Sequence, residues 1–307
     1  MKALRRRASS KNRRFWLSVN HSQTRMFKST NCEDKALLAA SDYAIAEDHT
    51  TDKYADFGQS ELRLAPYQVS VVLPIYNEKE CIQKTIDTVL DYIDRHAFVD
   101  FILVDDGSTD GTSQLLIDRL CTCQTTRLQL ISCPDRQGKG HAVRQGINAA
   151  TGDYICFMDG DLAYSLAHHY PLLEKLEDAD IVIGCRSLIC DRQRNLPLTR
   201  KITGRIFNLC SQSILNLRFR DMQAGLKGFR KEAAKALFKK QVINGFSFDV
   251  ELIYLAQKMG YTIDEIPAWV SLSHDHKHSK VNLLRDSYKM LIDLFKIRYN
   301  DSLGRYE

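Results

Sequence analysis

Short apolar runs alternate with amphipathic segments through the middle of the chain. Five runs have the length and aliphatic character of buried strands, at residues 69–73, 101–104, 128–131, 154–158 and 181–183. Residues 81–93, 111–120 and 139–150 carry apolar side chains at helical spacing between the first four runs. Strands that alternate with helices of about 10–15 residues indicate βαβ units. We therefore predict an α/β fold with a mostly parallel sheet flanked by helices.

The pattern becomes mostly helical after residue 186. Helical spacing predicts helices over residues 198–217, 232–238, 248–259 and 282–298, and residues 261–270 fit one or two strands. The last of these helices is amphipathic, with apolar Leu284 and Phe295 and a basic flank that includes Lys289. Such a helix packs on a core or lies at a membrane interface.

Charge and periodicity both change near residue 67. Residues 1–30 contain nine Lys and Arg and no acid, whereas residues 31–66 contain eight acids and three basic residues. We expect a largely disordered arm and linker over residues 1–66, a folded domain over 67–298 and a tail over 299–307. The basic arm is either solvated or in contact with an anionic membrane surface. We favour these readings over a transit peptide or a nucleic-acid contact, and we predict no nucleic-acid partner.

Hydropathy excludes an integral membrane protein. No run reaches the roughly 18 apolar residues that a spanning helix needs, and no signal-peptide core follows the basic start. The nine cysteines form no CxxC pair, which favours reduced thiols in a cytosolic protein. We expect a cytoplasmic protein whose membrane contact is peripheral, at the inner face of a membrane.

Polar residues follow four of the predicted strands. They occur in Pro74-Ile75-Tyr76-Asn77-Glu78, in Asp105-Asp106-Gly107-Ser108, in Gly138-Lys139-Gly140 and in Asp159-Gly160-Asp161. Each segment alone is typical of a turn. In a parallel sheet, however, the carboxyl ends of the strands share one edge, so the four segments should meet around one cleft.

The residue types in this predicted cleft suit a nucleoside diphosphate. Paired carboxylates at Asp159 and Asp161 suit a divalent metal that carries a diphosphate. Asp105 or Asp106 can accept hydrogen bonds from a base or ribose, and Tyr76 offers a flat face for stacking. Lys139 at a helix start suits phosphate. Glycine spacing excludes both a P-loop and a dinucleotide fingerprint.

The ordered segments PIYNE (74–78), VDDGSTDGT (104–112), GKGHAVRQGINAATGD (138–153) and DGDL (159–162) resemble the family 2 glycosyltransferases, which have a GT-A fold. Residues 220–229, 248–252 and 279–281 resemble the polyprenyl-phosphate branch, most closely the dolichyl-phosphate glucosyltransferases and next the mannosyltransferases. The resemblance covers roughly residues 69–298. It implies inverting, metal-dependent hexose transfer to a polyprenyl or dolichyl phosphate, with Mg²⁺ or Mn²⁺. UDP-glucose is the leading donor and GDP-mannose the alternative.

The resemblance assigns roles to the matching positions. Nucleotide-sugar binding falls on Pro74, Tyr76, Glu78, Asp106, Lys139 and Asp159, and metal binding on Asp159 and Asp161. Catalytic roles fall on Asp161, Arg186 and Asp249, and contacts with phosphate or acceptor on Arg186, Arg205 and Lys280. Asp249 is the candidate general base, and the alternative is an acid that merely favours a helix N-terminus.

Two segments depart from the family pattern or add to it. Ala163 stands where mannosyl relatives often carry a metal-assisting Gln, which counts against a simple mannosyl assignment. His274, His276 and His278 alternate along a predicted loop that could bind metal, contact the diphosphate or be solvated. We expect His168 and His169 to be surface residues at a helix start.

Other functions remain open at the level of sequence. The acceptor could be a glycan, a protein or a small hydroxyl compound, which would require a general base. A decayed nucleotide-binding protein is the non-enzymatic alternative, although the intact Asp159, Asp161 and Lys139 count against it. A sugar nucleotidyltransferase is less favoured because its glycine-rich loop should follow the first strand.

Overall fold

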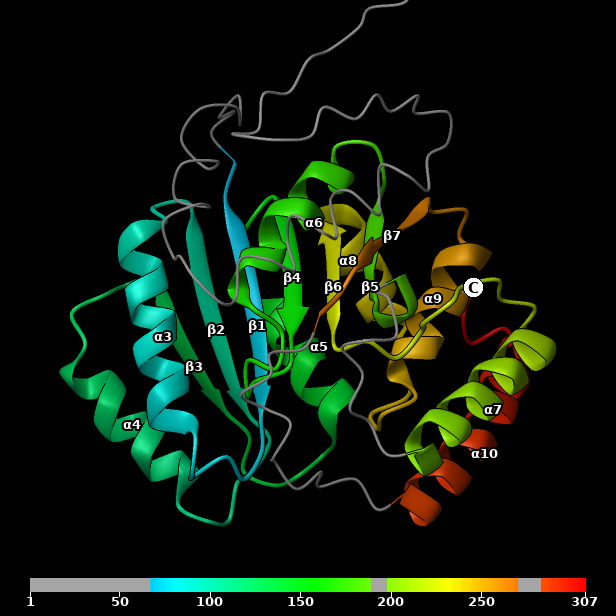
Figure 1. Ribbon diagram of the computed structural model, residues 1–307, viewed down its shortest axis with the longest axis horizontal. Coiled ribbons are helices and arrows are strands. Elements are labelled where there is room, and N and C mark those ends of the chain that lie inside the picture. The colour runs from blue at the N-terminus through cyan, green and yellow to red at the C-terminus, as the bar shows by residue number, and fades with distance from the viewer. Residues whose placement is uncertain (1–66, 189–197, 270–282) are drawn as a thin grey trace, which may run out of the picture. The chain divides into compact units, whose positions relative to one another are not determined.

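A seven-stranded sheet forms the centre of the protein (Figure 1). The computed structural model describes residues 67–188, 198–269 and 283–307, with side chains described from residue 206 in the second of these ranges and the residues before it in that range described by their backbone alone, and from residue 288 in the third. The strands are β1 (Val69–Ile75), β2 (Val99–Asp105), β3 (Leu128–Ser132), β4 (Tyr154–Met158), β5 (Ile181–Cys185), β6 (Leu226–Arg230) and β7 (Ile263–Pro267). Their order is β3-β2-β1-β4-β6-β5-β7, and only β6 runs antiparallel to its neighbours. The mostly parallel sheet predicted from the sequence is confirmed.

Helices cover both faces of this sheet. They are α3 (Ile82–Arg95), α4 (Thr112–Thr122), α5 (Lys139–Ala149), α6 (His169–Leu176), α7 (Leu198–Leu215), α8 (Lys231–Lys240), α9 (Phe248–Lys258) and α10 (Leu283–Ser302), with single 3₁₀ turns at Leu166–His168 and Arg186–Leu188. One apolar cluster joins the sheet to α3, α4 and α6, and the other joins its opposite face to α5, α8 and α9. Helices α7 and α10 pack side by side (Figure 1). Burial of both faces explains why the strands are almost continuously apolar.

The chain departs from the sequence prediction at β6 and at its end. The sequence pattern does not reveal β6, because its five residues include Lys227 and Gly228, which are poor strand formers. Helix α10 extends to Ser302 rather than ending at 298, and Tyr306 beyond it is 1% exposed. No helix in the described part of the chain is both long and apolar enough to cross a membrane.

The prediction that His168 and His169 are surface residues is wrong. Both side chains are buried at the junction of the 3₁₀ turn and α6. His168 Nδ1 lies 2.8 Å from the carbonyl oxygen of Ser165, and His169 Nδ1 is hydrogen-bonded to the Tyr92 hydroxyl. Burial lowers the pKa of His168 to about 4 and that of His169 to about 3, so both rings are neutral and pack as core residues.

Candidate active site

Those predicted site residues that follow β1, β2, β4 and β5 or begin α5 lie at the carboxyl edge of the parallel strands. Strands β1, β2 and β3 end level, since Ile75 pairs with Asp105 and Asp105 with Ser132. Strand β4 ends at Met158, which pairs with Leu226 at the start of antiparallel β6. The loops after β1, β2 and β4, the start of α5 and the segment before β6 therefore meet at one edge.

The carboxylates of Asp159 and Asp161 follow β4 directly. Asp159 Oδ1 accepts a 2.7 Å hydrogen bond from Lys139 Nζ, and the Asp159 side chain is 34% exposed. Asp161 is half-buried, and its Oδ1 accepts a 3.0 Å bond from the backbone N–H of Ala163. The backbone N–H of Asp159 donates to Gly225 O at 3.0 Å, and a Cβ on Gly225 would overlap the Asp159 carboxylate. Gly225 therefore leaves the space that this carboxylate occupies.

Lys139 is the first residue of α5, and carboxylates surround its ammonium group. Burial alone lowers the pKa of Lys139, but Asp159 and Asp249 outweigh burial and raise it above its ordinary value. The lysine therefore remains protonated beside the first turn of the helix, where backbone N–H groups and the helix dipole also favour an anion. This arrangement can hold a phosphate group.

The loop before α5 is held by Asp106. The backbone N–H groups of Gln137 and Gly138 donate to its two carboxylate oxygens at 3.0 and 2.8 Å. Gly138 has φ of 116°, and an added Cβ would meet Asn244 O at 2.5 Å, so no other residue fits there. Asp106 is 3% exposed. It shapes the loop, and its assignment to the nucleoside stays a prediction.

Tyr76 and its neighbours lie after β1. The Arg136 guanidinium lies over the Tyr76 ring, 4.1 Å from its centroid, which pairs a cation with a flat aromatic face. Pro74 is half-buried within β1. Glu78 Oε2 accepts a 3.0 Å hydrogen bond from the Cys81 thiol. The sequence assigned no role to Arg136, although it directly precedes the Gln-Gly-Lys segment.

Arg186 follows β5 and is held by Asp221. Its Nε and one terminal nitrogen donate to the two Asp221 oxygens at 2.7 and 2.9 Å, and its backbone N–H donates to Oδ2 at 3.1 Å. Burial raises the pKa of Asp221, but Arg186 outweighs it and the pKa falls below its ordinary value. Tyr164 is buried and interacts electrostatically with Arg186 and Asp221. Burial raises the pKa of its hydroxyl to about 12. The sequence analysis assigned no role to Tyr164, nor to Asp221, although Asp221 lies in the 220–229 segment that carries the family resemblance.

Asp249, the candidate general base, lies in the first turn of α9. It is 3% exposed, and its Oδ1 accepts a 2.6 Å bond from Lys227 Nζ. Lys227 also donates to Ala224 O at 2.8 Å, and burial lowers its pKa although Asp249 opposes the shift. Lys227 was missed because the Asp249 partner is 22 residues away in the chain.

The remaining predicted positions are not described at side-chain level. Arg205 belongs to α7, but its side chain lies outside the described residues. Lys280 and the alternating His274, His276 and His278 also lie outside them. Their assigned roles stay predictions.

Comparison with known proteins agrees with this architecture. A family model described as Glycosyl transferase family 2 matches residues 70–238. Dolichyl-phosphate beta-glucosyltransferase of Dictyostelium discoideum is 29% identical over 77% of this chain and 75% of its own length. The Homo sapiens protein of the same name is 32% identical, with 65% and 66% covered.

Solved structures show the same fold. Glucosyl-3-phosphoglycerate synthase of Mycobacterium tuberculosis, in complex with Mn²⁺, UDP and glucosyl-3-phosphoglycerate, has a TM-score of 0.53 at 21% identity. The alignment covers 76% of this chain and 80% of that one. The mostly parallel sheet and its covering helices are those of the GT-A glycosyltransferases. The chain belongs to glycosyltransferase family 2 and is a hexosyltransferase.

Proposed function

We propose that this protein transfers glucose from UDP-glucose to a polyprenyl phosphate, using Mg²⁺ or Mn²⁺ held by Asp159 and Asp161. The observation that carries the proposal is the 2.7 Å contact between Lys139, at the start of α5, and Asp159, which lies two residues before Asp161 at the same sheet edge. The two relatives described above are dolichyl-phosphate glucosyltransferases, which supports the choice of sugar and acceptor.

The donor site fits a diphosphate with a hard divalent cation. Asp159 and Asp161 offer carboxylate oxygens, the ligand type that Mg²⁺ and Mn²⁺ prefer. When bound, the cation would stabilise negative charge on the departing nucleoside diphosphate. Lys139 contributes a preorganised positive charge beside Asp159, and the N-terminus of α5 adds backbone donors. Asp106 would contact the nucleoside, and Tyr76 with Arg136 would stack against the base.

The acceptor side favours an anion over a hydroxyl compound. Asp221 orients Arg186 through two hydrogen bonds, and the Arg186 side chain is 34% exposed. A phosphate acceptor is already ionised at neutral pH, so it needs orientation more than deprotonation. Asp249 is ion-paired to buried Lys227, which makes it a charge partner rather than an unencumbered base. This contact favours the phosphate acceptor that the names of the relatives suggest.

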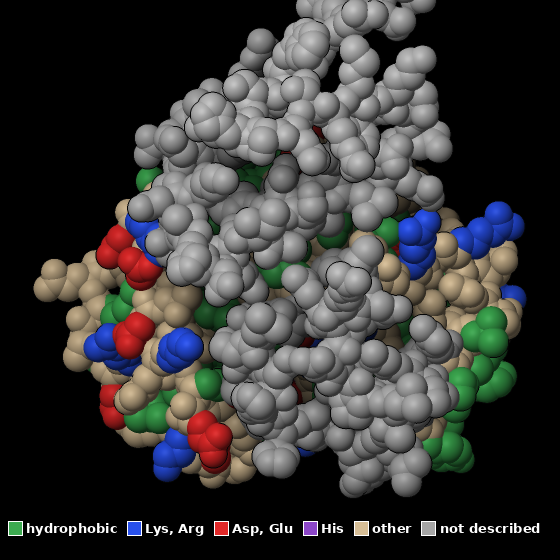
Figure 2. All heavy atoms as spheres, in the orientation of Figure 1, with side chains coloured by type: hydrophobic (Ala, Val, Ile, Leu, Met, Phe, Trp, Pro, Cys, Tyr) green, Lys and Arg blue, Asp and Glu red, His purple; other side chains and the backbone are tan. Residues whose placement is uncertain are grey.

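An apolar face formed by α7 and α10 provides the membrane contact in this proposal. Exposed apolar side chains follow the helical repeat on α10 and continue on α7, at Tyr288, Ile292, Phe295, Tyr299, Ile206 and Leu209. Figure 2 shows apolar side chains on the edge of the molecule where these helices lie. Exposed Lys289, Lys296 and Arg298 flank the α10 stripe. An apolar face with basic flanks suits the surface of an anionic bilayer, and this supports the proposal of a peripheral enzyme at the cytoplasmic face of a membrane.

A ligand screen followed by a transfer assay tests the proposal. With Mn²⁺ present, UDP-glucose should raise the melting temperature more than GDP-mannose, because a ligand selective for the folded state stabilises it. Radiolabelled glucose should then pass to a polyprenyl phosphate and not to the dephosphorylated alcohol. Equal shifts with both donors would contradict the choice of donor, and transfer to the alcohol would contradict the choice of acceptor.

A further inference from the structure

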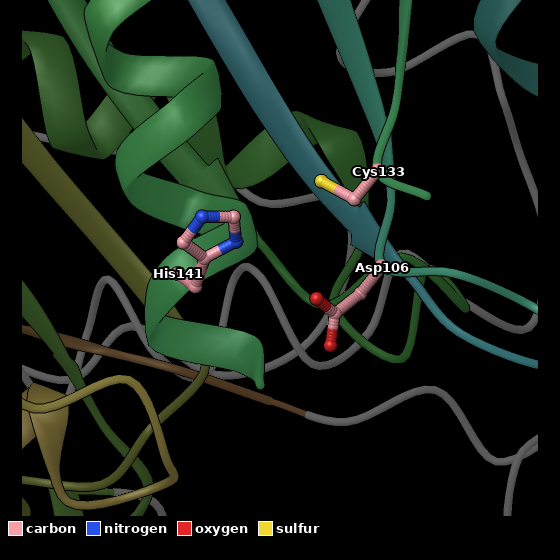
Figure 3. Close-up of side chains that lie close together, drawn as sticks. All are labelled: Asp106, Cys133 and His141. Atoms are coloured by element: carbon pink, nitrogen blue, oxygen red, sulfur yellow. The ribbon is translucent and has the colours of Figure 1, made fainter. Parts of the chain in front are cut away.

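We propose that Asp106, Cys133 and His141 form a second cation site, selective for a soft divalent ion of the Zn²⁺ type. One ligand atom from each residue lies within 4.8 Å of the other two. Figure 3 shows the three side chains facing one another, with His141 on α5 and the other two after neighbouring strands. This group shares no residue with the Asp159 and Asp161 pair, which follows β4, whereas the new group lies after β2 and β3 and on α5.

Each of the three donors sits on a backbone position that is fixed by hydrogen bonds. Asp106 follows β2, and its backbone N–H donates to Ile75 O at 2.9 Å. Cys133 follows β3, and its backbone N–H donates to Asp105 O at 2.8 Å. His141 lies in the first turn of α5, where its backbone N–H donates to Asn244 O at 3.3 Å. The three donors therefore project from backbone positions that are already fixed relative to one another.

His141 carries the observation that points to a ligand. Its Nδ1 atom is buried and has no hydrogen-bond partner among the described residues. A buried polar atom without a partner is unfavourable, and a bound ion would supply the missing partner. Its Nε2 lies 3.0 Å from Nε2 of Gln145. Turning the Gln145 amide by half a rotation lets its oxygen accept the Nε2 proton, which leaves Nδ1 as the metal-binding nitrogen.

The chemistry of the donors selects the ion. Thiolate, imidazole and carboxylate together are a zinc ligand set, whereas Mg²⁺ and Mn²⁺ prefer oxygen alone. The Asp106 oxygens each keep a lone pair after accepting one backbone N–H. Binding requires the Cys133 thiol to lose its proton to solvent, and the two anionic ligands then neutralise the dication. Cys133 and His141 are partly exposed, so an ion can enter and a water can complete the tetrahedron.

This site has a consequence for activity that rests on the proposed function. Asp106 is the residue assigned to the nucleoside, so an ion bound to its carboxylate would exclude the donor. Zn²⁺ would then inhibit competitively with UDP-glucose, while Mn²⁺ at Asp159 and Asp161 would not. Cation binding itself does not depend on the proposed function.

Co²⁺ titration of the full chain without nucleotide tests the site. Cobalt bound through a cysteine gives a sulfur-to-metal charge-transfer absorption in the near ultraviolet, which oxygen ligands do not give. We expect this band to saturate at one equivalent and to disappear when Zn²⁺ is added. The band should be lost in Cys133→Ser. In His141→Ala the affinity for Co²⁺ should fall at least tenfold. Cys121→Ser, at an exposed cysteine of α4, should behave as wild type. Circular dichroism would verify that each variant is folded.

The outcomes separate the site from the proposed function. No band in the wild-type protein, or a band that survives in folded Cys133→Ser, would overturn the cation site. If the band behaves as expected but UDP with Mg²⁺ does not weaken Co²⁺ affinity, the competition is wrong while the site stands. If no nucleotide sugar binds under any condition, the proposed function fails and the titration result is unaffected.

Discussion

Lys227 Nζ lies 2.6 Å from Oδ1 of Asp249, and the two side chains are only 1% and 4% exposed. This ion pair joins β6, which lies in the sheet, to the first turn of α9. Lys227→Met should destabilise the fold by about 3–5 kcal/mol, because it leaves an uncompensated buried carboxylate. Urea unfolding would measure the loss. The double variant Lys227→Met/Asp249→Leu should recover most of it, and an equally unstable double variant would show that packing rather than charge is responsible.

The Asp249 carboxylate should not be required for chemistry on a phosphate acceptor. Asp249→Asn should keep appreciable kcat with polyprenyl phosphate, because the acceptor needs no deprotonation. A hydroxyl acceptor would instead need a general base, worth about 10²–10⁴-fold. Single-turnover rates measured on the folded Asp249→Asn variant would decide whether Asp249 acts as a general base. A loss of that size at constant melting temperature would restore Asp249 as the base.

The proposed metal-binding pair, Asp159 and Asp161, should control the rate of transfer. Asp161→Asn should lower kcat by about 10²–10³-fold, the usual cost of one preorganised electrostatic contact. Asp118→Asn, at an exposed acid on α4, is the matched control and should be neutral. Steady-state kinetics at saturating Mn²⁺ would test this. A comparable loss of kcat in Asp161→Asn and Asp118→Asn would mean that the loss reflects the change in net charge and not the site.

Gly225 offers a test of how closely the Asp159 carboxylate must be placed. Gly225→Ala should reduce kcat/KM by about 10²-fold, since a misplacement of about 1 Å can cost that much, and the added methyl group would overlap Asp159. Gly245→Ala is the control, because a Cβ there meets nothing within 4 Å. Mn²⁺ affinity by isothermal titration should fall in parallel. Wild-type kinetics in Gly225→Ala would show that Asp159 has room to move.

Tyr306 should stabilise the protein in a pH-dependent way. Its hydroxyl donates to Glu251 Oε1 at 2.6 Å. Burial raises the pKa of Glu251 above its ordinary value of 4.5, and the Tyr306 bond opposes the rise. Because the pKa of Glu251 is raised in the folded protein, its contribution to stability is fully present below pH 4.5. That contribution is lost as the pH rises through the pKa of Glu251 in the folded state.

Tyr306→Phe removes the opposing bond, so the Glu251 pKa should rise further. The cost should be about 1–3 kcal/mol at neutral pH and smaller in acid, where Glu251 is protonated in both states. Denaturant melts across pH would check this, with Tyr299→Phe, an exposed tyrosine on α10, as the control. A pH-independent cost would contradict the linkage.

The α7 and α10 face should bind anionic vesicles. Phe295→Ser should weaken binding about tenfold or more, since burial of a large apolar side chain contributes roughly 1.5–3 kcal/mol. Ile117→Ser, at an exposed residue of α4, should have no effect. Liposome flotation, repeated without residues 1–30, would measure both contributions. Equal binding by the two variants would place the membrane contact elsewhere.

Much of the fold could be predicted because its signals are local. The apolar runs that became β1, β2 and β4 stand out by length and composition, and the helices between them by their period. Strand β6 was missed because its apolar content is low and its antiparallel pairing depends on β4 and β5. His168 and His169 were misjudged for a related reason, since polarity alone suggests the surface while the fold buries both.

The sequence by itself determined the alternation of strands and helices, and with it the single sheet edge at which Asp159, Asp161 and Lys139 lie. Only the tertiary structure decided which charges face one another. Arg186 finds Asp221 35 residues away, and Glu251 finds Tyr306 55 residues away. Periodicity reports a residue's environment along its own element, whereas an ion pair depends on distances of a few ångströms between elements. Those distances exist only after the sheet and its helices have packed.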